Sequence, residues 1–156
     1  MTPEPQALYD LAPVIELMLV GLLLALGPFT WVLWRNRQAS PQRRLQALTV
    51  LTLFLTFDLV LFGAFTRLTD SGLGCPDWPG CYGSATPVGA RTEIAAAEAA
   101  MPTGPVTVQK AWIEMIHRYL ATGVGVLIIA LVAMTWRLRA QARRGQAPAL
   151  PLSPGW

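Results

Sequence analysis

The sequence predicts an all-α integral membrane protein with three transmembrane helices, and this prediction rests on composition, hydropathy and the placement of charge. Of its 156 residues, 53% are hydrophobic and 13% are charged, which is about half the charged share of a typical soluble domain. A membrane-spanning helix needs roughly 20 predominantly apolar residues. Three stretches qualify, and they are residues 11–34, 45–66 and 111–136.

The basic residues predict how these helices are oriented. Arginines gather in the short connection after the first span and again after the third span, at Arg35, Arg37, Arg43, Arg44, Arg137, Arg139, Arg143 and Arg144. Short basic loops stay in the cytoplasm. We therefore expect the N-terminus, a polar lead of residues 1–10, and the connection 67–110 outside, and the tail 137–156 in the cytoplasm. The net charge is +3, and the basic residues flank the spans without forming any nucleic-acid-binding motif. Nucleic acid is therefore not an expected partner.

The connection between the second and third spans, residues 67–110, is long enough to indicate a function of its own. Its first part is rich in glycine and proline, which is typical of turns. Its middle, residues 91–101, is rich in alanine and predicts a short helix that ends at Pro102 and Gly104.

Both cysteines, Cys75 and Cys81, lie in this connection, on the side expected to be outside. In a bacterium that side is the periplasm, where disulfides form. The turn residues between the two cysteines allow them to meet, so we expect a disulfide worth about 2 kcal/mol on the chain-entropy model.

The third span opens with ionisable residues, and such residues inside a membrane helix are functional candidates. Glu114 and His117 are three residues apart and share a helix face. His117 is the only histidine, which leaves three uses open: a heme ligand, a proton relay or an interhelical hydrogen bond. Glu114 is either a proton donor and acceptor or a carboxylate at a helix start. Arg67 is either a boundary anchor or a ligand for a heme propionate. Arg118 has three open uses: a propionate contact, an ion pair with Asp58 in the second span, or an outward-pointing anchor.

Two segments resemble heme A synthases. Residues 63–83, GAFTRLTDSGLGCPDWPGCYG, resemble the first outer loop of that family, and residues 110–119, KAWIEMIHRY, resemble the start of its next helix. The resemblance covers residues 45–140 and is to the N-terminal portion of the family. It implies a multi-pass protein of the bacterial inner membrane that oxidises a methyl group of heme O to a formyl group, for cytochrome oxidase assembly. It further implies that His117 is an axial ligand of heme iron, that Glu114 is catalytic, and that Cys75 and Cys81 are a redox-active pair.

The chain departs from the family pattern in its histidine count. Family members usually have two four-helix halves with histidine pairs, one half for the substrate heme and the other for heme b. A single histidine supplies one axial ligand, so we expect the second from a missing C-terminal half, a second polypeptide or a homo-oligomer. Heme O synthase is a further candidate partner, and catalysis by this chain alone is not expected. Two alternatives remain: a non-catalytic heme-binding subunit for cytochrome oxidase assembly, and a membrane thiol–disulfide protein, although the cysteines lack the C-x-x-C spacing.

Overall fold

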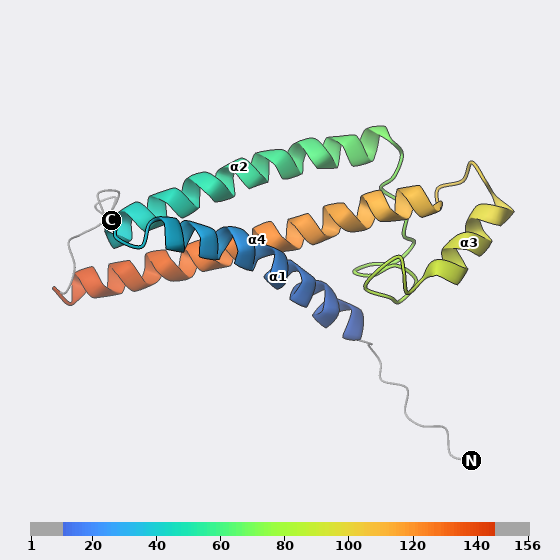
Figure 1. Ribbon diagram of the computed structural model, residues 1–156. Coiled ribbons are helices and arrows are strands. Elements are labelled where there is room, and N and C mark those ends of the chain that lie inside the picture. Colours follow the sequence, from blue (N-terminus) through green and yellow to red (C-terminus); the bar gives the residue numbers. More distant parts are fainter. Residues whose placement is uncertain (1–10, 146–156) are drawn as a thin grey trace, which may run out of the picture. The chain divides into compact units, whose positions relative to one another are not determined.

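The computed structural model describes residues 11–145, which form four helices and no strand: α1 (Ala12–Arg35), α2 (Pro41–Leu68), α3 (Arg91–Ala100) and α4 (Val108–Arg143). In Figure 1, α3 lies in the connection between the end of α2 and the start of α4. Three of the helices, α1, α2 and α4, are long and apolar enough to cross a membrane. The predicted fold class, an all-helical membrane protein with a short helix in its long connection, is therefore confirmed. The predicted polar lead, and residues 146–156 of the predicted tail, lie outside the described residues.

The turn between α1 and α2 is closed by local hydrogen bonds. The Ser40 hydroxyl accepts a hydrogen bond from the backbone N–H of Arg43 at 3.3 Å, as an N-cap residue does, and Pro41 occupies the first helical position, where its missing N–H costs nothing. The Arg44 guanidinium donates to the carbonyl of Asn36 at 3.1 Å. These contacts explain why α2 begins at Pro41, earlier than residue 45, where the apolar stretch starts.

Helix α4 is longer than the apolar stretch that predicts it, because it starts at Val108 and continues past Trp136 to Arg143. The added C-terminal residues are mostly arginine, leucine, alanine and glutamine, all good helix formers. Positive charge at a helix C-terminus also interacts favourably with the helix dipole. Hydropathy alone reports the apolar part of such a helix and misses its basic extension.

The described chain divides into two compact units, each with its own core. Unit 2 comprises residues 21–61 and 120–145, and its buried residues are Ala25, Val32, Leu48 and Leu127. Here α1 and α4 approach closely, because a Cβ on Gly21 would overlap the side chain of Thr122, and a Cβ on Gly123 would lie 3.5 Å from the Gly21 carbonyl oxygen. Small residues commonly allow this kind of contact between membrane helices.

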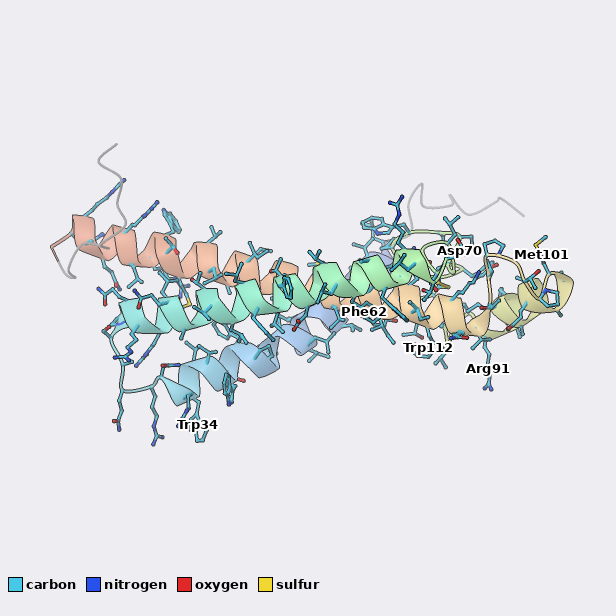
Figure 2. All side chains as sticks on the ribbon, turned by 90° about the horizontal axis from the view of Figure 1, so that it is seen from above. Trp34, Phe62, Asp70, Arg91, Met101 and Trp112 are labelled. Atoms are coloured by element: carbon cyan, nitrogen blue, oxygen red, sulfur yellow. A yellow bond between two sulfur atoms is a disulfide. The ribbon has the colours of Figure 1, made fainter. Side chains whose placement is uncertain are left out.

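Large apolar side chains point away from the long helices over much of their length, as the sticks in Figure 2 illustrate. Exposed examples are Leu23 on α1, Phe54 and Phe57 on α2, and Ile129 and Val132 on α4. An exposed apolar surface of this extent is costly in water and suits lipid. Together with the three long apolar helices, it supports a multi-pass membrane protein.

Unit 1 comprises residues 11–20 and 62–119, and it contains the long connection. Its buried core includes Ile94 from α3, Ala111 and Met115 from α4, and both cysteines. Helix α3 is therefore anchored through Ile94, while the side chain of Arg91 at its start projects outward in Figure 2. In the first turn of α3, the backbone N–H of Glu93 and the Thr92 hydroxyl lower the pKa of the Glu93 carboxyl.

Candidate functional site

A pocket of about 440 Å³ lies in unit 1 between the end of α2 and the first turns of α4. Its size falls within the range of about 300–1,000 Å³ that is common for small-molecule sites. The pocket is lined by Gly63, Thr66, Arg67, Asp70, Gly72, Leu73, Glu114, His117 and Arg118. The four candidate site residues of the sequence, Arg67, Glu114, His117 and Arg118, all line this one pocket, so the fold brings the end of one span and the start of the next together around them. Asp58 is not among the residues that line it.

His117 lies half-buried on α4 with its ring against α2. The imidazole stacks on Phe62, with ring centroids 6.1 Å apart and an interplanar angle of 15°. Its Nε2 atom faces Gly63, because a Cβ built on that glycine would lie 2.9 Å from Nε2. The glycine therefore leaves room beside the imidazole that any other residue would fill.

Glu114 is buried one turn before His117, and both oxygens of its carboxylate have partners. Its Oε2 accepts a hydrogen bond from the backbone N–H of Cys75 at 2.7 Å, and its Oε1 forms a salt bridge with the guanidinium of Arg118. A buried carboxylate is costly unless it is paired and hydrogen-bonded, and both conditions are met here. The sequence suggested a carboxylate near a bound group but not its bond to the cysteine backbone, since no motif encodes a contact to an amide 39 positions away.

Arg118 contacts the backbone of the loop between the two cysteines. Its Nη1 donates to the carbonyls of Asp77 at 2.8 Å, Pro79 at 3.3 Å and Gly80 at 2.5 Å, while Nη2 pairs with Glu114. Both terminal nitrogens of the Arg118 guanidinium therefore bind groups of the protein itself. Arg67, in contrast, is exposed at the end of α2 and lines the pocket from the other side.

The loop between the cysteines is closed by a Cys75–Cys81 disulfide, as the sequence predicts. The carboxylate of Asp77 accepts hydrogen bonds from the backbone N–H groups of Tyr82 at 2.5 Å and Gly83 at 2.7 Å. Tyr82 and Gly83 both have positive φ, at 50° and 72°, a conformation that glycine adopts without strain. The Asp77 side chain therefore stabilises the turn that returns the chain from Cys81.

Two further side chains of α4, those of Lys110 and Tyr119, hold the long connection. The ammonium of Lys110 forms a salt bridge with Asp70 at 3.2 Å and donates to the carbonyl of Gly104 at 3.1 Å. The hydroxyl of Tyr119 donates to the carbonyl of Ala85 at 2.6 Å. Neither contact was expected from the sequence, although Lys110 and Tyr119 both lie within the segment 110–119 that carries the resemblance. Side chains of α4 thus contact the connection at several points beyond the disulfide loop.

Long apolar helices and a pocket beside a disulfide-closed loop define a multi-pass membrane protein whose pocket has a size common for small-molecule sites. The family comparison is more specific. Residues 46–153 match the model of a family described as cytochrome oxidase assembly protein. The chain therefore belongs to this family, and its resemblance to the N-terminal portion of heme A synthases is confirmed.

Several curated relatives carry the name heme A synthase. The chain is 47% identical to the heme A synthase of Shewanella oneidensis over 81 residues, which make up 52% of the chain and 24% of that protein. It is 30% identical to the heme A synthase of Sinorhizobium medicae over 128 residues, covering 75% of the chain and 35% of that protein. A protoheme IX farnesyltransferase of Roseiflexus is 29% identical over 104 residues, 15% of its length. The chain thus spans about a quarter to a third of the heme A synthases. No solved structure matches the chain.

The residues lining the pocket fit a heme by the chemistry of their donors. A heme needs one or two axial ligands from protein, because the porphyrin supplies the other donors to iron, and His117 provides one imidazole at the pocket wall. A guanidinium suits a propionate, and the exposed Arg67 offers one. Nε2 of His117 faces Gly63, which lines the same pocket, so the nitrogen that would hold an iron lies beside the space left by the missing side chain at position 63.

Proposed function

We propose that this chain takes part in heme A biosynthesis by forming a pocket that receives heme O, whose methyl group is oxidised to a formyl group. Membership of the family supports heme A biosynthesis at the family level. The observation that supports a heme pocket in this chain is the convergence of His117, Glu114 and Arg67 on one cavity. We propose that the connection 67–110 faces the outside of the bacterial inner membrane, as the arginine distribution predicts.

Within this pocket, each residue has a separate role. His117 binds the iron through its imidazole, and Arg67 holds a propionate through its exposed guanidinium. Bound heme O supplies the iron centre and the methyl group that is oxidised. With water as the oxygen source, conversion of the methyl group to a formyl group releases four protons and four electrons. In our proposal an electron acceptor outside this chain takes the electrons, and Glu114 is the carboxylate at the pocket wall that accepts protons. The propionate contact predicted for Arg118 remains a prediction, although the contacts of its guanidinium with Glu114 and the loop favour a different role.

In our proposal, partners of this chain supply the second axial ligand and bind the heme b of the full family architecture. The partner is a C-terminal half, a second polypeptide or a second copy. The relatives named heme A synthase are about three to four times longer than the part that aligns here, as the 35% and 24% coverage indicates. Their additional length is sufficient for further helices that contribute ligands.

The ligand assignment is tested by the absorption spectrum of the purified chain with heme supplied. We expect a ligand-bound heme spectrum in the wild type, and at least about a tenfold loss of affinity in His117→Ala, which corresponds to about 1.4 kcal/mol. Ile129→Ala, a change at an exposed position of unit 2, is the control and should bind heme like the wild type. An unchanged spectrum and affinity in His117→Ala would contradict the assignment. Heme O turnover, measured with and without candidate partners, separates an enzyme from a non-catalytic heme-binding subunit for cytochrome oxidase assembly.

A membrane thiol–disulfide protein is the second candidate, because the disulfide lies directly against a pocket residue, with the Cys75 amide bonded to Glu114. A protein of this kind needs its cysteines for thiol–disulfide exchange whether or not heme is bound. Replacement of both cysteines by serine, with heme binding and heme O turnover intact, would exclude it.

A further inference from the structure

One turn of α4 holds the disulfide loop at both of its ends. Glu114 accepts the N–H of Cys75, the first residue of the loop. Arg118, one turn further on, donates to the carbonyls of Asp77, Pro79 and Gly80, which lead to Cys81. The two side chains also pair with each other, so a single ion pair bridges the beginning and the end of the loop.

The contacts of Arg118 depend on the shape of the loop. Three carbonyl groups from a stretch of four residues converge on one guanidinium nitrogen, which requires a tightly curved backbone. The disulfide maintains this curvature by keeping the Cα atoms of the two cysteines 4.8 Å apart. Without the S–S bond the ends of the loop are free to separate, and the carbonyls no longer have to converge.

We propose that Arg118 is a positioning residue that ties the Glu114 carboxylate to the oxidised loop, so that the redox state of the Cys75–Cys81 disulfide sets where Glu114 lies at the pocket. The contact network stands independently of the bound group, and only the importance of Glu114 for the reaction rests on the proposed function. When the disulfide is reduced, the guanidinium loses its carbonyl partners and the Cys75 amide moves, so Glu114 loses the groups that fix it. Such a coupling is reciprocal: removal of the Arg118 or Glu114 contacts must make the disulfide easier to reduce.

The first test measures the thiol–disulfide equilibrium of the full chain in detergent with glutathione. Two reduced glutathione molecules supply two electrons and two protons, the S–S bond breaks, and one oxidised glutathione and two protein thiols result. We expect Arg118→Lys to shift this equilibrium toward the dithiol about tenfold, which is ~30 mV for a two-electron couple. Lysine keeps the charge but lacks the planar set of donors that reaches several carbonyls. Glu114→Gln should shift it in the same direction.

The matched control is Arg91→Lys, the same change at an exposed arginine that starts α3 and that makes no hydrogen bond to the cysteine loop in the described part of the chain. It should leave the equilibrium within about twofold of the wild type, which is ~10 mV on the same scale. If Arg118→Lys and Glu114→Gln also stay within this range, the proposal is wrong. Helical content by circular dichroism identifies any variant that does not fold.

A second measurement uses the wild-type chain and so does not depend on how a variant at Arg118 folds. The infrared difference spectrum between the oxidised and reduced forms should contain a carboxylate band that disappears in Glu114→Gln. The absence of any such band would overturn the proposal, since Glu114 would then not respond to the disulfide. Neither measurement requires heme, so failure of the proposed function, seen as no heme binding by the wild type, is distinct from failure of this inference.

Discussion

Replacement of Gly74 by alanine should lift the disulfide loop away from α4, whereas the same change at Gly72 should leave it in place. A Cβ on Gly74 would lie 2.5 Å from the carbonyl oxygen of Lys110 and 2.6 Å from the amide nitrogen of Ala111, while a Cβ on Gly72 would meet nothing within 4 Å. Comfortable contacts between heavy atoms begin at about 3.5 Å, so the overlap at Gly74 approaches an ångström. The atoms in the way belong to the backbone of α4 and have no rotamer to change.

The expected cost is therefore near the upper end of the range for overpacking, about 3 kcal/mol. If the loop lifts off without global unfolding, this corresponds to roughly a hundredfold larger population of the undocked loop, since about 1.4 kcal/mol is a factor of ten. Hydrogen–deuterium exchange of the Cys75 amide, whose N–H is bonded to Glu114 when the loop is docked, measures that population. If a folded Gly74→Ala protein exchanges the Cys75 amide as slowly as the wild type, the docking of the loop on α4 is refuted. Fast exchange in Gly72→Ala would show that the exchange rate does not report on this docking.

Two further glycine substitutions test the pocket and the helix packing. Gly63→Ala places a methyl group 2.9 Å from Nε2 of His117, the nitrogen that would hold iron in the proposed function. Heme affinity measured by titration should therefore fall about tenfold or more, equivalent to at least about 1.4 kcal/mol. Gly21→Ala overlaps Thr122 and should destabilise unit 2 by about 1–3 kcal/mol in thermal unfolding, while Gly125→Ala, with nothing within 4 Å, should be neutral or gain up to about 1 kcal/mol from helix propensity. Wild-type heme binding in Gly63→Ala, or equal stability of the Gly21 and Gly125 variants, would contradict the respective contact.

The membrane fold was predictable because its main signals are local in the sequence. Apolar stretches of sufficient length predict the three long helices, and the alanine-rich segment before Pro102 predicts α3, observed at Arg91–Ala100. The bounds were less predictable where polar residues continue a helix. At the start of α2 the signal was a serine followed by a proline, and at the end of α4 it was a run of good helix formers with arginines.

Four of the residues that line the pocket were predictable from the sequence, but their contacts were not. Ionisable side chains at the edge of an apolar stretch identify Arg67, Glu114, His117 and Arg118, and all of them line the pocket. The partners of Glu114 and Arg118, however, are mainly backbone N–H and carbonyl groups of the disulfide loop. Backbone groups have no residue identity, so a sequence pattern cannot single them out. The sequence left a propionate, Asp58 and the membrane boundary as the possible partners of Arg118.

These backbone contacts connect the two segments that resemble heme A synthases. The first segment supplies the end of α2 and the disulfide loop, the second supplies the first turns of α4, and the bonds from the Cys75 amide to Glu114 and from Arg118 to the loop carbonyls join them. The two motifs therefore form one structural unit and not two independent sites. His117 lies on the same helix within one turn of this junction, so a change in the loop can alter the wall of the pocket through Glu114 without touching the imidazole. The disulfide loop thus supports the wall of the pocket. Under the proposed function, a change in the loop should therefore alter the position of the Glu114 carboxylate before it alters the ligation of iron by His117.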